Sequence, residues 1–374
     1  MLSKRTIPLL IPVIALSAVV FIQLVYFIIF LVAFSKKRQV KPSGNFPVSI
    51  IVCAHDEEEN LRELVPLLLN QNYPEFEVII VNDRSNDDTY DFLLEETRNH
   101  PKVKMVNVKA TPEHVNSKKY AITLGIRAAT HEWILLTDAD CRPQNENWIN
   151  AVSTNFEDNK QFVLGFSPYI AKPGFLNMFI RFESIITALQ YLSFAWMKNP
   201  YMGVGRNLAY RKSLFLEKKG FNNMLHVMGG DDDLFVNEHA NGKNTAVAVS
   251  ADAIVHSVAK TTWRSFFRQK IRHLKVGKRY KFGHKFLLGI FKFTWLLTWA
   301  VGLPLMFLYE YYYFIIIAFV IRWSIMAWST KALLKKTGLL FSLWMIPILD
   351  FVYPIYYISA GLAALFTKRV QWKN

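Results

Sequence analysis

Long apolar runs lie near both ends of the chain, and shorter alternating segments lie between them. Residues 7–34 carry no charge and only Gln23 as a strongly polar residue. Three more apolar segments follow later, at about residues 286–308, 312–329 and 339–366. A helix needs about 20 mostly apolar residues to cross a bilayer. The pattern predicts a membrane anchor in residues 1–41 and a membrane region of about three segments in residues 286–374.

Basic residues are distributed unevenly around the first apolar run. Two precede it and four follow it at once: Lys4 and Arg5 before, and Lys36, Lys37, Arg38 and Lys41 after. By the positive-inside rule, this asymmetry places the amino terminus outside and the next region in the cytoplasm. We therefore predict an integral inner-membrane protein whose central domain faces the cytoplasm.

The last apolar segment conflicts with the same rule. Three basic residues follow it: Lys368, Arg369 and Lys373. They would lie outside if all three later segments crossed the membrane. The segment contains two prolines, so we expect it to be kinked or re-entrant. Charges are costly in lipid, and we expect Arg322 and Asp350 to pair with each other or to face a cavity.

The central region, residues 42–285, alternates strand-like segments with helical ones. Strands are predicted at residues 48–54, 76–81, 103–108 and 133–136, and helices after residue 56 and over residues 117–129. Strands that alternate with helices form a largely parallel sheet. The predicted fold class is α/β, with a Rossmann-like mixed sheet that is mainly parallel and collects acidic residues at one edge.

Two carboxylates follow the most apolar of these strands. Residues 133–136 run into Asp138 and Asp140, which are separated by one alanine. Side chains two positions apart in an extended chain point the same way, so both carboxylates can converge on one point. Hard oxygen ligands suit Mg²⁺ or Mn²⁺, whose coordination is often completed by nucleotide phosphates. The alternative is a polar turn after a strand.

Acidic residues also stand after other predicted elements. Asp56 and Asp83 each follow the carboxyl end of a strand, where open α/β sheets bind their ligands. Asp56 has a second interpretation as the N-cap of the next helix. Farther on, residues 231–233 are three consecutive aspartates. Their repulsion raises the pKa of at least one and suits a general base, although a solvated loop or helix start is the alternative.

The composition and net charge of the chain fit a membrane-associated protein. The chain is 52% hydrophobic and 15% aromatic, with a net charge of +15. A basic chain can bind nucleic acid or an anionic membrane face. The long apolar runs and the lack of a nucleic-acid-binding motif favour the membrane, so we expect no nucleic-acid partner. Cys53 and Cys141 are too few for a disulfide framework, and we expect both to be reduced.

Seven segments taken together resemble one protein family. In chain order they are residues 48–61, 77–88, 117–126, 137–140, 203–207, 230–234 and 269–273. Their order and spacing are similar to those of family 2 glycosyltransferases with the GT-A fold, over about residues 46 to 280. The compact membrane-bound bacterial members look most similar. The resemblance implies an inverting transferase with a nucleotide-diphosphate sugar as donor, which we expect to be UDP-linked.

The resemblance also implies roles for residues on the donor side. Asp56 and Asp83 would contact the base and ribose of the nucleotide-sugar. Asp138 and Asp140 would hold the nucleotide and its Mg²⁺ or Mn²⁺. Lys118 would sit near the donor, with a solvated helix start as the alternative.

For the base, the family pattern is Glu-Asp-x-Asp-Leu, and Gly230 stands here in place of the glutamate. Asp231 then takes the position of the usual base, and Asp232 is the alternative base. Asp233 completes the catalytic cluster. The implied acceptor region comprises Gly205, Arg206 and Asn207.

Residues 254–285 carry ten lysines and arginines and no acid, which suits a face that rests on anionic headgroups. Within them, Gln269, Arg272 and His273 match the family's Gln-x-x-Arg-Trp motif, with histidine for tryptophan. The resemblance places this motif beside the donor diphosphate and the acceptor. The apolar, aromatic segment at residues 175–197 has two interpretations, a helix in the membrane interface or an internal core helix.

These features predict a membrane-bound glycosyltransferase that moves a sugar from a nucleotide-sugar to a membrane lipid. One alternative is a processive polysaccharide synthase, although about four spans provide little wall for a polymer tunnel. Another is a non-catalytic membrane protein that senses nucleotide-sugar or anionic lipid. Such a protein could lose its base and metal carboxylates, yet both acidic clusters are present.

Overall fold

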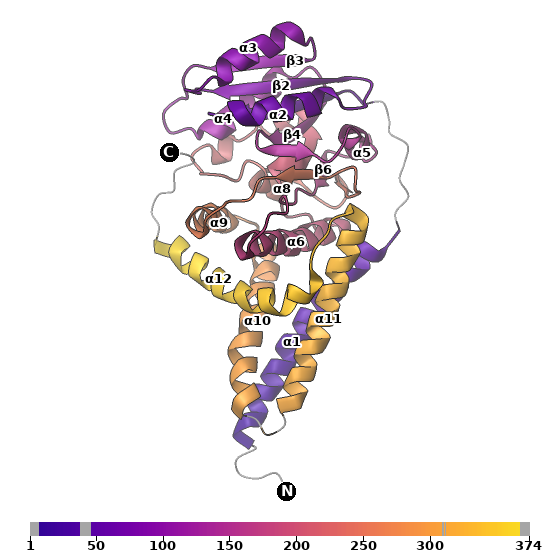
Figure 1. Ribbon diagram of the computed structural model, residues 1–374, viewed down its shortest axis with the longest axis vertical. Helices are drawn as coiled ribbons and strands as arrows, with labels where there is room; N and C mark the ends of the chain where they lie inside the picture. The colour runs from indigo at the N-terminus through magenta and orange to yellow at the C-terminus, as the bar shows by residue number, and fades with distance from the viewer. Residues whose placement is uncertain (1–6, 38–45, 309, 311, 367–374) are drawn as a thin grey trace. The chain divides into compact units, whose positions relative to one another are not determined.

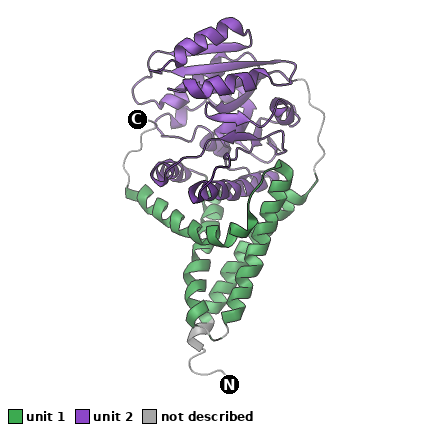
Figure 2. Ribbon diagram, viewed as in Figure 1, with its two compact units in different colours: residues 1–37, 281–367 green, residues 38–280, 368–374 purple. Residues whose placement is uncertain are grey.

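The computed structural model describes residues 7–37, 46–308, 310 and 312–366. They form two compact units (Figure 2). The sheet unit holds the described part of residues 38–280, and the helical unit holds that of residues 1–37 and 281–367. Several basic residues used in the charge argument lie outside the described residues: Lys4, Arg5, Arg38, Lys41, Lys368, Arg369 and Lys373.

The sheet unit is built on a seven-stranded sheet in the order β3-β2-β1-β4-β7-β6-β8 (Figure 1). Its strands are β1 (Val48–Ala54), β2 (Phe76–Asp83), β3 (Val103–Val108), β4 (Trp133–Asp138), β6 (Phe162–Gly165), β7 (Leu208–Arg211) and β8 (Thr245–Ala248). Neighbours are parallel except at β7, which is antiparallel to both β4 and β6. The predicted α/β class with a mainly parallel sheet is confirmed. Two short strands, β5 (Cys141–Pro143) and β9 (Val255–Ser257), form a separate antiparallel pair.

Helices and short 3₁₀ turns connect these strands. They are α2 (Glu58–Leu69), α3 (Thr89–Asn99), α4 (Ser117–Ala128), α5 (Trp148–Ser153), α6 (Phe175–Trp196), η1 (Gly205–Asn207), α7 (Lys212–Glu217), η2 (Asn222–Met224), α8 (Asp233–His239) and α9 (Trp263–Gly277). The first and third strands have the predicted bounds. The second and fourth run two residues farther than predicted, so Asp83 and Asp138 are the last residues of β2 and β4.

Alternation along β1 separates the two faces of the sheet. Ile50 belongs to the buried core that includes Leu64 of α2 and Trp148 of α5. Ile51, one position on, faces α4 instead, as period-two geometry requires. A Cβ on Gly125 of α4 would lie 2.8 Å from a methyl carbon of Ile51. This glycine therefore allows α4 to lie close against the sheet, which fixes the position of the residues at its start.

Helix α6 is mostly buried. The Tyr191 hydroxyl donates to the carbonyl oxygen of Gly165 at 2.5 Å, and the Glu183 carboxylate pairs with Lys270 Nζ at 2.5 Å. Both partners belong to the sheet unit. These contacts favour the interpretation of α6 as an internal core helix rather than as a helix in the membrane interface.

The helical unit contains α1 (Ile7–Ser35), α10 (Phe282–Leu308), α11 (Tyr312–Thr337), the 3₁₀ turn η3 (Leu343–Met345) and α12 (Ile346–Phe366). By length and composition, all four α-helices can cross a membrane, as the apolar runs predict. Helices α1, α10 and α11 form a bundle, whereas α12 runs across its end (Figure 1). This course agrees with the expectation that the last segment is not a simple span.

A buried polar cluster joins the helices of this unit. Arg322 Nη1 lies 2.7 Å from Asp350 Oδ2, and both side chains have no exposed area. The same oxygen accepts the indole N–H groups of Trp299 at 3.0 Å and Trp323 at 2.8 Å. Arg322 also donates to the Gln23 side-chain oxygen at 3.3 Å. The predicted pairing of the two charges is confirmed, and charge-assisted hydrogen bonds offset part of their desolvation.

Candidate active site

The carboxyl ends of three neighbouring parallel strands meet at one edge of the sheet. Cys53 of β1 lies opposite Asp138 of β4 on one side and Val81 of β2 on the other. Asp56 therefore follows the end of β1 between two strands that end in Asp138 and Asp83. This edge is where open α/β sheets place their ligands.

Asp56 joins the loops that follow β1 and β2. Its backbone N–H donates to Ser85 Oγ at 3.0 Å, and its Oδ1 accepts the Asn86 N–H at 2.7 Å. Helix α2 begins at Glu58, and its N-cap is Glu57. The interpretation of Asp56 as the N-cap is therefore wrong. Its exposed carboxylate stays at the strand edge because the backbone turns there, with φ of 53°.

Asp83 is fully buried. Its two carboxylate oxygens accept from Arg84 Nε at 2.8 Å and Nη2 at 3.3 Å. Its carbonyl oxygen contacts His55 Nδ1 at 2.6 Å. The neighbouring Arg84 thus places a guanidinium directly on the carboxylate expected to contact the ribose.

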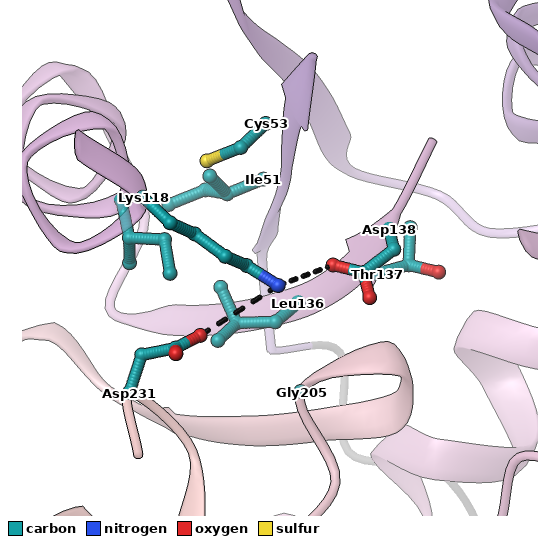
Figure 3. A pocket seen from close by; sticks show the side chains of 9 residues that line it. Ile51, Cys53, Lys118, Leu136, Thr137, Asp138, Gly205 and Asp231 are labelled. Carbon is teal, nitrogen blue, oxygen red and sulfur yellow. Dashed lines mark hydrogen bonds and ion pairs between the residues drawn. The ribbon is translucent and has the colours of Figure 1, made fainter. Parts of the chain in front are cut away.

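Lys118, in the first turn of α4, bridges the two acidic clusters. Its Nζ lies 2.9 Å from Asp138 Oδ1 and 3.7 Å from Asp231 Oδ2 (Figure 3). Cys53 and Gly205 line the same pocket. The alternative interpretation of Lys118 as a solvated helix start is wrong, because its side chain points inward between the two carboxylates.

The pKa values of Lys118, Asp138 and Asp140 are shifted in different directions. Burial disfavours the charged form of Lys118, but Asp138 and Asp231 outweigh it, so the pKa of Lys118 is raised. Burial likewise opposes ionisation of Asp138, but Lys118 outweighs it and the pKa of Asp138 is lowered. At Asp140, burial and then the charge of Asp138 raise the pKa. The charged form of Asp140 is therefore disfavoured here, and a bound cation would stabilise it.

The two residues expected to hold a divalent cation are Asp138, which ends β4, and Asp140, which lies in the turn after it. In the described part of the chain, no three His, Cys, Asp or Glu side chains are grouped as a metal site. Two carboxylates are too few for a closed protein site. They suit an ion such as Mg²⁺, which keeps water and takes phosphate oxygens from its substrate.

Each aspartate of the second cluster has a different environment. Asp232 is the N-cap of α8, and its two oxygens accept the N–H groups of Asp233 at 2.8 Å and Gly205 at 2.7 Å. Asp233 accepts the Tyr280 hydroxyl at 2.7 Å. Asp231 instead lines the pocket. Asp232 and Asp233 are thus held by hydrogen bonds within the protein, and Asp231 faces Lys118.

Mutual repulsion within this cluster is confirmed. Burial and then the charge of Asp231 raise the pKa of Asp232. Burial and then the charge of Asp232 raise the pKa of Asp233 well above its usual range.

The segment before the cluster is fixed by a residue that sequence reasoning missed. Lys119 is fully buried, and its Nζ donates to the carbonyl oxygens of Val227 and Gly229. Gly229 and Gly230 have φ of 80° and 79°, and a Cβ on Gly230 would lie 2.7 Å from Leu234 Cδ1. The backbone therefore requires glycine where the family has glutamate.

In the expected acceptor region, Asn207 and Arg206 have different contacts. The Asn207 side chain accepts the Trp148 indole N–H at 3.2 Å and donates to the carbonyl oxygens of Phe166 and Ala253, both at 2.8 Å. We therefore assign Asn207 a structural role. The Arg206 guanidinium lies 4.5 Å from the centre of the Tyr169 ring.

Helix α9 carries the other three candidate residues. Burial opposes ionisation of Asp138, but Lys118, then Arg206 and then Arg272 lower its pKa. His273 is exposed, and Gln269 is partly buried. The helix thus brings one cation near the acidic pocket.

Comparisons with known proteins agree with this fold. Residues 49–217 match the model of the family "Glycosyl transferase family 2". The sequence is 28% identical over 253 residues to a probable glycosyltransferase, YdaM, of Bacillus subtilis, covering 66% of this chain and 58% of that protein. Residues 49–217 thus form a glycosyl transferase family 2 domain. The chain spans little more than half the length of this relative.

Shorter matches involve enzymes with different acceptors. A poly-beta-1,6-N-acetyl-D-glucosamine synthase of Staphylococcus epidermidis is 31% identical over 93 residues, or 25% of this chain and 21% of that one. A beta-monoglucosyldiacylglycerol synthase of Trichormus variabilis is 30% identical over 126 residues, or 32% and 26%.

A solved structure supports the GT-A fold. The mannosyltransferase PcManGT from Pyrobaculum calidifontis, in complex with GDP-Man and Mn²⁺, has a TM-score of 0.59 at 18% identity. The match covers 96% of this chain and 99% of that one. At this identity the likeness concerns the fold.

Proposed function

We propose that the chain is an inverting glycosyltransferase of the inner membrane that moves a sugar from a nucleotide-diphosphate sugar, UDP-linked in our proposal, to a membrane lipid. The position of Lys118 carries the proposal. One ammonium group lies within 3.7 Å of a carboxylate from each acidic cluster. The residues proposed to bind the donor and to activate the acceptor thus meet in one pocket.

The proposed chemistry starts at Asp231. Its carboxylate takes the proton of an acceptor hydroxyl, whose oxygen attacks the anomeric carbon while the bond to the diphosphate breaks. Lys118 and Arg272 place positive charge near the leaving diphosphate. Mg²⁺ or Mn²⁺ held by Asp138 and Asp140 would supply further charge neutralisation. Asp56 and Asp83 are proposed to contact the base and ribose.

Helix α9 and one of the sequence matches support a lipid acceptor. Trp263 and Arg264, at the start of α9, are both exposed, and α9 continues the basic run that suits anionic headgroups. One short match is a synthase of a glycosylated diacylglycerol. The other short match, a polysaccharide synthase, supports the processive alternative.

The test uses the full-length chain in native lipid extract with UDP- and GDP-sugars and Mn²⁺. We expect nucleotide release from one donor and labelled sugar in the organic phase. Label in a long water-soluble polymer would favour the processive synthase. Label confined to small water-soluble sugars would exclude the lipid acceptor, and binding without nucleotide release would favour the non-catalytic alternative.

A further inference from the structure

A cavity of about 250 Å³ lies between α10 and α12 in the helical unit. Most of its wall is apolar or aromatic, and includes Phe293 and Leu296 of α10 and Pro354 and Ile358 of α12. Phe293 is 59% exposed and Ile358 40%, so the cavity opens to the outside of the helices. Helix α10 is long and apolar enough to cross a membrane, so a lipid of the bilayer can reach this opening.

One cation stands in this apolar wall. Lys292 donates to the hydroxyl of Tyr353. Its Nζ lies 4.5 Å from the centre of the Tyr353 ring and 5.2 Å from that of Tyr357. A charged side chain within a membrane segment is costly and marks a site with a specific counterpart. The ammonium and the tyrosine hydroxyl can both donate to phosphate oxygens.

We propose that this cavity binds an anionic phospholipid, with part of one hydrocarbon chain between α10 and α12 and the phosphate group against Lys292 and Tyr353. Size and charge both support this occupant. Dry apolar cavities of about 150 Å³ hold benzene, so this larger one takes a longer hydrocarbon segment. Basic pockets between membrane helices bind lipid head groups. The site uses no residue of the transferase pocket and goes beyond the proposed function.

Two glycines of α10 provide a matched pair of variants. Gly289 lines the cavity, and a Cβ there would meet no heavy atom within 4 Å. Gly289→Leu therefore fills the cavity without displacing the backbone. Gly283 lies in the same helix with equally open surroundings, and it is not part of the wall. Gly283→Leu controls for the effect of leucine on the helix itself.

A second pair tests the charge. Lys292→Gln removes the cation from the wall, and Lys285→Gln removes an exposed lysine of the same helix. The full-length variants are purified in membranes of equal parts phosphatidylcholine and phosphatidylglycerol. Native mass spectrometry then counts the lipids that stay bound, and thermal unfolding is followed in each lipid alone.

Wild type and Gly283→Leu should retain phosphatidylglycerol and unfold at higher temperature in it than in phosphatidylcholine. Gly289→Leu should lose the bound lipid and this difference. In Lys292→Gln, the preference for phosphatidylglycerol over phosphatidylcholine should fall roughly tenfold, as expected for the loss of one charge-assisted hydrogen bond. Lys285→Gln should keep the wild-type preference. Retention of lipid by Gly289→Leu equal to that of wild type would overturn the proposal. Because that variant keeps Lys292, its result stands even if Lys292→Gln does not fold.

Discussion

Asp231 and Asp232 are adjacent in the chain, but their carboxylates have different neighbours. Asp231 lies 3.7 Å from the Lys118 ammonium, whereas both oxygens of Asp232 accept backbone N–H groups. A carboxylate engaged as a helix cap contributes to stability, whereas Asp231, although buried, lines the pocket beside Lys118. The surroundings therefore favour Asp231 over Asp232 as the proposed base.

Asparagine at each position separates these roles. Asp231→Asn should lower the transfer rate by about 10²–10⁴-fold with donor binding retained, because the amide does not take the proton. Asp232→Asn should keep most activity, since asparagine also caps helices. Asp232→Ala should lose stability by about 1 kcal/mol, measured by thermal unfolding. Near-normal transfer by Asp231→Asn with loss in Asp232→Asn would reverse the assignment.

Asp140 is the second proposed ligand of the metal ion. Its neighbour Asp138 is already paired with Lys118, whereas burial and the charge of Asp138 raise the pKa of Asp140. Asp140→Ala should weaken nucleotide binding in the presence of Mn²⁺ and leave binding without metal nearly unchanged. Titration calorimetry measures both affinities. Asp158→Ala, at a fully exposed carboxylate, is the control, and unchanged Mn²⁺-dependent binding in Asp140→Ala would remove the metal assignment.

At the scale of elements, the start of α4 organises both acidic clusters. Lys118 contacts Asp138 and Asp231, and the next residue, Lys119, holds the backbone of residues 227–229. Burial lowers the pKa of Lys119 despite the charges of the nearby aspartates. The two lysines therefore differ in function: one lies in the pocket, and the other fixes the segment that carries Asp231.

Removal of the Lys119 ammonium tests this second role. Lys119→Met keeps an unbranched stem but leaves two buried carbonyl oxygens without their donor, which costs about 1–3 kcal/mol. We expect kcat to fall while KM for the donor changes little, because the donor carboxylates lie at the ends of β1, β2 and β4 and not on the segment that Lys119 holds. Lys119→Arg should restore part of kcat, and Lys109→Met, at an exposed position, should have no effect. A fall in donor affinity as large as the fall in kcat would contradict the role.

Sequence patterns predicted β1 to β4 well because the signal for a strand is local, whereas β5 to β9 were not predicted. The apolar runs located β1 to β4 within two residues, and the carboxylates at their ends followed directly. The role of Lys119 was not predictable, since its partner carbonyls are over a hundred positions away. The N-cap interpretation of Asp56 was wrong because hydrogen bonds to the loop after β2 outweighed a local preference. Tertiary packing also decides the burial of α6.

At the scale of the whole molecule, the course of α12 bears on the membrane topology. The sequence leaves a conflict, because three crossings after the central domain would place the final basic residues outside. Helices α1, α10 and α11 lie side by side as a bundle, whereas α12 runs across its end (Figure 1). If the three bundle helices cross and α12 does not, residues 368–374 lie on the cytoplasmic side and the conflict disappears.

This topology gives an expected result for reporter fusions. A fluorescent protein that matures only in the cytoplasm should be bright when fused after Asn374, and alkaline phosphatase, active only outside, should be silent there. The same phosphatase inserted after Glu310, between α10 and α11, should be active and serves as the control. We expect this pattern because two crossings through α10 and α11 return the chain to the cytoplasm, where the positive-inside rule retains Lys368, Arg369 and Lys373. An active phosphatase after Asn374 would instead show that α12 crosses the membrane, against both the charge distribution and the course of the helix.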